Sequence, residues 1–233
     1  VRIIAFNDIS NEIAENEQES WSKLIRVLTH EIMNTVTPIA SLSETLSSYM
    51  VDKDADSDVL AGLETISQSS RGLIKFVESY RNLTRVAAPV KKAFYVREMI
   101  DRVIQLTAQQ TSKAGAVCTY LEKSDDILLY ADESQISQIL INLIRNACQA
   151  GANKVEITAE LDRSDSVFIH VTNNGRPISK ESREEIFVPF YTTKQEGTGI
   201  GLSLSRQIMR LHNGTLTLTR SDESGTVFTL YFK

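Results

Sequence analysis

Residues 29–38 read THEIMNTVTP and lie inside a helical pattern that extends over about residues 20–50. Apolar residues at helical spacing form one stripe of this pattern, and polar residues that include His30 and Asn34 fall on the opposite side. We therefore expect His30 to face solvent. Pro38 cannot donate a hydrogen bond to the carbonyl group one turn earlier, so the helix is expected to bend just beyond His30.

The imidazole of His30 has neighbours that suit nucleophilic chemistry. The carboxylate of Glu31 is a candidate base, and the amide of Asn34, one turn along the helix, is a candidate partner for orienting water. The segment alone is equally consistent with an ordinary solvated helix face. A zinc site is not favoured, because the chain has only three histidines and neither His170 nor His212 lies at a metal-ligand spacing from His30.

Length and composition limit the classes of protein to which the chain can belong. Its 233 residues, of which 42% are hydrophobic, are enough for two domains with proper cores. The net charge of -5 argues against a general nucleic-acid-binding surface. No apolar run is long enough to span a bilayer, and the N-terminus has no signal-peptide layout. We expect the chain to be cytoplasmic, with any inner-membrane anchor of the full-length protein in an upstream region.

The N-terminal segment, residues 1–19, is predicted to be the end of an upstream domain followed by a connector. Residues 1–6 form a short β-branched run that suits a last strand. The acidic, weakly amphipathic residues after it form either a signalling linker helix or a solvated connector.

A second long helical pattern follows the polar loop at residues 52–58 and ends near Val86. Two long helices joined by a short loop make an antiparallel hairpin, which we assign to residues 20–87. Each helix has one apolar stripe, and two helices alone bury little surface. We therefore expect the hairpin to pair with a second copy in a four-helix bundle, which makes the protein a homodimer.

Residues 87–90 interrupt the helical pattern, and we assign residues 88–233 to a second domain. Its helices are interspersed with strands that are mostly joined by hairpins, which favours a two-layer α/β sandwich with one face of the sheet covered. The chain as a whole is thus predicted to be α+β. Helices are expected to about residue 114, over residues 133–150 and to about residue 211, and strands near residues 94–96, 117–121, 127–130, 155–161, 167–172, 215–219 and 227–232.

Two asparagines, Asn142 and Asn146, lie one turn apart at the margin of the apolar stripe of the helix at residues 133–150. An asparagine at a core margin is costly unless it is hydrogen-bonded, and a carboxamide pair there can hold a hydrated Mg²⁺. Arg145 is placed to reach a phosphate. A helix with two exposed asparagines is the alternative interpretation.

A glycine-rich run, GTGIGL at residues 197–202, opens directly into the last predicted helix. Glycines just before a helix let backbone N–H groups approach an anion at the positive end of the helix dipole. The run does not follow a parallel βα turn, as a Rossmann fingerprint would. Its position after a polar loop favours the hinge of a phosphate-gripping lid.

In this order, these features resemble the motifs of a sensor histidine kinase of two-component signalling, and the resemblance covers nearly the whole chain. Residues 30–38 resemble the H box, residues 142–147 the N box, residues 187–194 the F box and residues 197–202 the last glycine box. Residues 225–228 are similar to the closing strand motif, whose threonine lies near adenine. The H box is similar to that of the subgroup of the nitrogen-regulation kinase NtrY.

The resemblance implies a dimerisation and phosphotransfer hairpin followed by an ATP-binding domain of the GHKL type, with the fold of gyrase, Hsp90 and MutL. Residues 1–19 resemble the end of a PAS sensor domain. ATP and Mg²⁺ are the implied cofactors, and the receiver domain of a response regulator is the implied partner. The implied reaction moves the γ-phosphoryl group of ATP to His30 and then to an aspartate of the regulator, with Asn34 orienting the water that dephosphorylates the regulator.

The resemblance also implies roles for the site residues. Glu31 accepts or orients the ring proton of His30, and Asn146, helped by Asn142, holds Mg²⁺. Lys194 and the backbone amides of the last glycine box hold the phosphates. The residues implied to bind the nucleotide are Asn142, Arg145, Asn146, Asn173, Gly175, Lys194, Gly197, Thr198, Gly199, Ile200, Gly201, Leu202 and Thr226.

The first glycine box departs from the family pattern. The family usually has Asp-x-Gly-x-Gly where residues 173–177 read Asn-Asn-Gly-Arg-Pro. The aspartate accepts a hydrogen bond from the adenine amino group, whereas Asn173 can accept through its carbonyl and donate through its amide. A neutral acceptor is weaker by roughly 1 kcal/mol, so we expect the ATP affinity to be lower by about tenfold. Pro177 is expected to stiffen the entry to the lid.

Two other classes of function remain open. Asn173 is compatible with a degenerate member of the family that binds a nucleotide without transferring its phosphate. An ATPase that acts as a conformational clamp would need a water-activating glutamate at the position of Asn142, so the asparagine there argues against that class.

Overall fold

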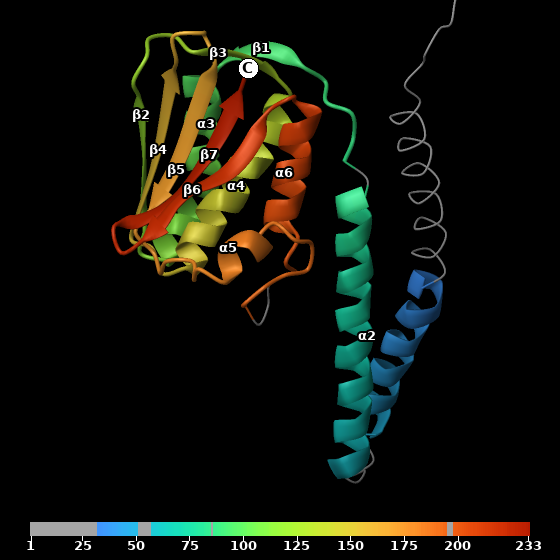
Figure 1. Ribbon diagram of the computed structural model, residues 1–233. Coiled ribbons are helices and arrows are strands. Elements are labelled where there is room, and N and C mark those ends of the chain that lie inside the picture. Colours follow the sequence, from blue (N-terminus) through green and yellow to red (C-terminus); the bar gives the residue numbers. More distant parts are fainter. Residues whose placement is uncertain (1–31, 51–56, 85, 195–197) are drawn as a thin grey trace, which may run out of the picture. The chain divides into compact units, whose positions relative to one another are not determined.

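The computed structural model describes residues 32–50, 57–84, 86–194 and 198–233 (Figure 1). The chain divides into two compact units, Val1–Arg85 and Val86–Lys233. The strand and linker expected in residues 1–19 lie outside the described residues, as do His30 and Glu31. In the part of the chain that is described, no helix is long and apolar enough to cross a membrane.

The first unit is a hairpin of two helices, residues 32–50 and α2 (Ser57–Thr84), which run side by side in Figure 1. The first of these helices continues through Pro38. Small or β-branched side chains fill the interior of the hairpin, which lets the two helices approach closely. The buried residues among those described are Val36, Ala40, Ser43, Ser70 and Val77.

Glu44 links the two helices through polar contacts. Its Oε1 accepts hydrogen bonds from Ser67 Oγ at 3.0 Å and from Arg71 Nε at 2.7 Å. The hydrogen bonds from Arg71 and Ser67 lower the pKa of Glu44. The side chains of Arg71 and Glu44 are 64% and 43% exposed, so their ion pair contributes little to the stability of the hairpin.

The second unit contains a two-stranded sheet and a five-stranded sheet. In the smaller sheet, β1 (Lys92–Tyr95) pairs antiparallel with β3 (Leu128–Ala131). The larger sheet has the strand order β2-β4-β5-β7-β6, with β2 and β4 parallel and the other neighbours antiparallel. Its strands are β2 (Val117–Glu122), β4 (Lys154–Leu161), β5 (Val167–Asn173), β6 (Thr215–Asp222) and β7 (Gly225–Phe232).

Helices cover one face of the larger sheet, with the hydrophobic core between the two layers (Figure 1). Fully buried and partly buried residues alternate along β5, as expected for a sheet with one covered face. This arrangement confirms the predicted α+β class. The helices are α3 (Val96–Lys113), α4 (Glu133–Gln149), the short α5 (Ser182–Glu185) and α6 (Gly201–Leu211).

The helix α4 belongs to the core and also carries candidate site residues. The carboxylate of Asp132 caps its N-terminus by accepting from the backbone N–H groups of Ser134 and Gln135. Its apolar stripe is buried in the core and leaves Asn142 and Asn146 at the margin, as the sequence pattern predicts.

Several local expectations differ from the structure. Val96 does not end a strand but begins α3. The strand β6 runs to Asp222, beyond its expected end, because an irregularity at Leu218/Arg220 interrupts the alternation of its side chains. The short helix α5 was not expected, since four residues are too few to show a helical period.

Candidate nucleotide-binding site

A cavity of about 610 Å³ lies beside α4 in the second unit. Its walls come from α4, from the end of β5 and the residues after it, from residues 191–194, 198–199 and 201–202, and from β7. Its volume suits a ligand of nucleotide size. The predicted site residues that line it are Asn142, Arg145, Asn146, Asn173, Lys194, Thr198, Gly199, Gly201, Leu202 and Thr226.

The N-terminus of α6 adjoins the cavity. Gly199 has a φ of +66°, and a Cβ there would lie 2.4 Å from the carbonyl carbon of Phe190. A Cβ on Gly201 would lie 2.3 Å from Oδ1 of Asn142. Position 199 therefore requires glycine, and a side chain at position 201 would displace the amide of Asn142. No side chain caps α6, so the backbone N–H groups of its first turn lack a side-chain acceptor and can receive an anion.

Asn142 lies in the cavity wall beneath α6 and is only 7% exposed. Its Nδ2 donates to Ser205 Oγ at 3.2 Å, and its Oδ1 accepts from a guanidinium nitrogen of Arg145 at 3.2 Å. The amide is therefore hydrogen-bonded at both ends, which resolves the cost of a polar group at the core margin. The contact with Ser205 also joins α4 to α6.

Asn146 and Gln149, which share one face of α4, together hold the ammonium of Lys194. The Nζ atom donates to Asn146 Oδ1 at 3.1 Å and to Gln149 Oε1 at 2.6 Å. Burial, followed by the charge of Arg145, lowers the pKa of Lys194.

The amide oxygens of Asn146 and Gln149 accept hydrogen bonds from the positively charged ammonium of Lys194. Neutral oxygens of this kind are also ligands that Mg²⁺ accepts. Asn146 therefore fits a Mg²⁺ ion whose other ligands are phosphate oxygens and water. No group of three or more His, Cys, Asp or Glu side chains that could hold a metal ion occurs in the described ranges. A metal at this site would depend on the phosphates for most of its charge.

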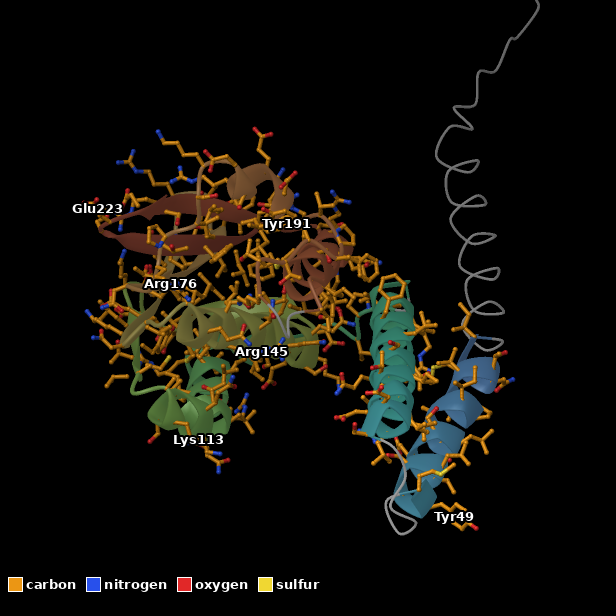
Figure 2. The ribbon with its side chains drawn as sticks, turned by 90° about the horizontal axis from the view of Figure 1, so that it is seen from below. Tyr49, Lys113, Arg145, Arg176, Tyr191 and Glu223 are labelled. Atoms are coloured by element: carbon orange, nitrogen blue, oxygen red, sulfur yellow. The ribbon has the colours of Figure 1, made fainter. Side chains whose placement is uncertain are left out.

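The charges that line the cavity are positive. Arg145 on α4, Arg176 beyond the end of β5 (both labelled in Figure 2) and Lys194 contribute to its walls. None of the described lining residues is an aspartate or a glutamate. A cavity with these properties is complementary to a polyanion.

A further part of the wall is apolar, with Ile178, Ile186 and Phe228 among its residues. Asn173, the last residue of β5, is 6% exposed here. Its Oδ1 accepts from Gly175 N at 3.1 Å, and its Nδ2 is 3.5 Å from the carbonyl oxygen of Thr226. An apolar wall with one polar group at its edge suits a planar aromatic base.

The comparisons with known proteins agree with this geometry. The family described as "Histidine kinase-, DNA gyrase B-, and HSP90-like ATPase" matches residues 131–233. The catalytic domain of the histidine kinase ThkA, in a nucleotide-free form, is 36% identical with a TM-score of 0.55, over 61% of this chain and 94% of that domain. The chain belongs to the sensor histidine kinases.

Curated sensor histidine kinases also match at lower identity. ZraS of Escherichia coli strain K12 is 25% identical over 95% of this chain and 49% of ZraS. The putative NtrY-like sensor histidine kinase of Rickettsia prowazekii is 24% identical over 98% of this chain and 40% of that protein. Because the identities to ZraS and to the NtrY-like kinase are nearly equal, at 25% and 24%, they do not assign the chain to the NtrY-like subgroup. The chain spans about half or less of the length of these relatives.

A solved complex extends the match to both units of this histidine kinase chain. The structure of ThkA in complex with the response regulator protein TrrA is 25% identical, with a TM-score of 0.65, over 99% of this chain and 68% of that chain.

Some predicted site residues do not line the cavity. Ile200 is 4% exposed, since its side chain is buried, and it is absent from the cavity wall. Gly175 packs against Ala150, where a Cβ would come within 2.9 Å of the Ala150 Cβ. Asn34 is exposed on the helix of residues 32–50 in the first unit. Gly197, like His30 and Glu31, lies outside the described residues.

Several residues of the cavity wall were not among the predicted site residues. Gln149, which holds Lys194, lies beyond the N box, although its i, i+3 spacing from Asn146 places both on one helix face. Arg176 lies in the departing glycine box. Tyr191 donates to Ser182 Oγ at 2.7 Å, a contact that no local pattern predicts.

Proposed function

We propose that this sensor histidine kinase binds Mg-ATP in the cavity beside α4 and transfers the γ-phosphoryl group to His30. The charge of the cavity carries the proposal. Arg145, Arg176 and Lys194 line it, and the described lining residues include no carboxylate. A nucleoside triphosphate would supply the negative charge, and its base would fill the apolar part of the wall. The match to the ATPase family supports ATP as the nucleotide.

The residues of the cavity can stabilise phosphoryl transfer by fixed positive charge. In the loose transition state of this reaction, charge spreads over the oxygens around the transferred phosphorus. Arg145, Lys194 and the N–H groups at the start of α6 would hold these oxygens, and their positions cost no reorganisation during the step. A Mg²⁺ ion held by Asn146 would supply further neutralisation when bound.

The acceptor in this proposal is a ring nitrogen of His30. Its lone pair attacks the γ-phosphorus, the N–P bond forms as the bond to the β,γ-bridging oxygen breaks, and ADP leaves. Glu31 accepts or orients the proton on the other ring nitrogen, which keeps the attacking nitrogen free.

We further propose that the phosphoryl group passes from His30 to an aspartate of a response regulator. The structural match to ThkA bound to the response regulator TrrA supports this class of partner. Asn34 is exposed and lies four residues after His30 in the sequence, and its amide could orient water against the phosphorylated regulator. The proposal thus includes a regulator phosphatase activity.

The apolar surface of the first unit supports a homodimer. Large apolar side chains remain exposed along both helices at spacings of three, four and seven residues, which are typical of a helix-packing seam. A second copy of the hairpin would cover this seam and complete a four-helix bundle. The exposed residues are Ile39, Leu42, Leu46, Tyr49, Val59, Ile66, Leu73 and Phe76.

Labelling with γ-³²P-ATP and magnesium tests the kinase proposal. Wild-type chain should acquire acid-labile label, and His30→Gln should acquire none. Label that persists in His30→Gln would refute His30 as the acceptor. Nucleotide binding without any label in the wild type would instead indicate the degenerate, binding-only class. The clamp ATPase class is disfavoured because it needs a water-activating glutamate at the position of Asn142, and an amide cannot take a proton from water.

A further inference from the structure

Ser205 on α6 is buried and donates its hydroxyl proton within its own helix. It is 2% exposed and is not one of the residues that line the cavity. Its Oγ donates to the carbonyl oxygen of Gly201 at 2.8 Å. Because a hydroxyl group has one proton, Ser205 can only accept from its second neighbour, which is Nδ2 of Asn142 on α4 at 3.2 Å.

Arg145 constrains the same amide at its other end. A guanidinium group only donates, and one of its nitrogens lies 3.2 Å from Oδ1 of Asn142. Exchanging the two amide atoms would set an amino group against this guanidinium. It would also let the amide oxygen pair with Ser205 only if the hydroxyl gave up its bond to Gly201. Both neighbours therefore select one orientation of the Asn142 amide.

In this orientation the amide of Asn142 presents its oxygen on the side of the ligand. A Cβ on Gly201 would lie 2.3 Å from Oδ1, so this oxygen lies against the first residue of α6. Gly201 and Arg145, which approach Oδ1, both line the cavity. Ser205, which holds Nδ2, does not. The acceptor of the amide thus belongs to the cavity wall and its donor to the protein interior.

A bound nucleotide would affect the two constraints differently. Arg145 is exposed and lines the cavity, so phosphate oxygens compete with Asn142 for its guanidinium. Ser205 is buried outside the cavity wall, so a ligand does not compete for its bond to Asn142. When phosphates engage Arg145, the bond to Ser205 keeps Oδ1 in place as a neutral oxygen of the kind that Mg²⁺ accepts.

We propose that Ser205 is a positioning residue for binding of the metal–nucleotide complex, because it holds the amide of Asn142 with Oδ1 toward the cavity. The inference rests on the proposed Mg-ATP function and deepens it. Ser205 lies outside the cavity wall, so its effect on the ligand passes through Asn142.

Ser205→Ala removes the acceptor of Nδ2 and releases the amide of Asn142. Its affinity for Mg-AMPPNP, measured by isothermal titration calorimetry, should fall about tenfold, the scale of one lost hydrogen bond to a charged group. Ser203→Ala is the matched control, because Ser203 is buried on the same helix but donates to the carbonyl oxygen of Ile200. It should bind like the wild type. An unchanged affinity in Ser205→Ala, or an equal loss in Ser203→Ala, would overturn the proposal.

A double-mutant cycle separates positioning from a general effect on the fold. Asn142→Ala has no amide to orient, so adding Ser205→Ala to it should change the affinity less than twofold. A further tenfold loss in the double variant would show that Ser205 does not act through Asn142. A wild type that binds no nucleotide would refute the proposed function itself, whereas binding that is insensitive to Ser205→Ala would refute only the positioning role.

If Ser205→Ala does not fold, hydrogen exchange of the side-chain amides in the wild type decides by NMR. In the Mg-AMPPNP complex, the Nδ2 proton of Asn142 that Ser205 accepts should exchange at least tenfold more slowly than those of Asn213, which is exposed. Equal exchange rates would show that the bond to Ser205 is not kept in the complex, and would overturn the proposal.

Discussion

The ammonium of Lys194 donates to Asn146 Oδ1 at 3.1 Å, the same oxygen that we propose as a Mg²⁺ ligand. The two residues are 48 positions apart in the sequence, and the contact joins the F-box segment to α4. Because one oxygen cannot serve both cations fully, binding of the metal should release Lys194 toward the phosphates. The second acceptor, Gln149 Oε1 at 2.6 Å, keeps Lys194 beside the cavity.

Replacing Lys194 with methionine tests its part in phosphate binding. The affinity for AMPPNP should fall about ten- to a hundredfold, since hydrogen bonds to charged groups contribute about 1.5–3 kcal/mol. The affinity for adenosine, which lacks phosphates, should not change. Both affinities can be measured by calorimetry. Lys113→Met, an exposed change on α3 (Figure 2), serves as the control, and an equal loss for both ligands in Lys194→Met would indicate a damaged fold instead.

The sequence predicts most of the second unit because its motifs coincide with helix starts and strand ends. Residues 142–147 lie on α4, and the glycine-rich run ends at the start of α6, as their local patterns require. The pairing of the strands could not be predicted from the sequence to the same extent. The parallel pairing of β2 with β4, and the antiparallel pairing of β1 with β3 in a separate sheet, depend on which strands share a core, and no local pattern encodes that.

The side-chain contacts of the cavity wall could likewise be predicted from the sequence only in part. Asn142 and Asn146 could be placed from helical spacing alone. The partner of Asn146 could not, because Lys194 reaches it only through the path of the chain after β5. The orientation of the Asn173 amide likewise depends on Thr226 from β7, since the two residues pair across neighbouring strands.

Replacing Gly199 with alanine should destabilise the second unit and weaken nucleotide binding. The φ of Gly199 is +66°, and the new Cβ would lie 2.4 Å from the Phe190 carbonyl carbon. Gly115→Ala is a matched control, with a φ of +68° and no atom within 4 Å of the new Cβ. The control should cost about 1–2 kcal/mol from backbone strain alone. Urea unfolding followed by circular dichroism should show a larger loss for Gly199→Ala, and equal losses would contradict the close approach to Phe190.

The cap of α4 should give the second unit an acid-sensitive contribution to its stability. Burial raises the pKa of Asp132, but hydrogen bonds from the side chain of Ser134 and from three backbone N–H groups outweigh it and lower the pKa. The contribution of the carboxylate is therefore fully present above the unfolded-state pKa of about 3.9, and it is lost as the pH falls through the lower folded-state pKa.

Asp132→Ala tests this cap. At pH 7 the variant should be less stable than the wild type by about 1 kcal/mol, the usual cost of losing an N-cap. The difference should shrink as the pH falls below about 4. Asp132→Asn keeps a capping oxygen that does not ionise, so its advantage over Asp132→Ala should not depend on pH. Urea titrations of the three proteins between pH 3 and pH 7 measure these differences, and a wild-type advantage that persists unchanged at pH 3 would contradict the assignment.

If the hairpin forms a homodimer through its exposed apolar seam, a charged side chain placed in that seam should separate the two copies. Leu42 is 62% exposed within one chain, so Leu42→Glu should not disturb the hairpin itself. In the bundle it would bury an unpaired carboxylate, which is strongly unfavourable. Sedimentation equilibrium should show a dimer for the wild type and a monomer for Leu42→Glu. Ser48→Glu, at an exposed position of the same helix that lies off the seam, should remain dimeric. A monomeric wild type would exclude the four-helix bundle.

Within the described part of the H box, residues 32–38, Asn34 is the residue to which we assign a role in the proposed phosphatase step. Asn34→Ala removes the amide that would orient the attacking water but leaves His30 and Glu31 unchanged. Autophosphorylation should therefore remain within about twofold of the wild type, and dephosphorylation of the regulator should slow about a hundredfold, which lies within the usual range for a positioned polar catalytic group. Ser41→Ala, at an exposed position two turns further on, should affect neither rate. Parallel loss of both activities in Asn34→Ala would assign this residue to the kinase step or to folding of the helix.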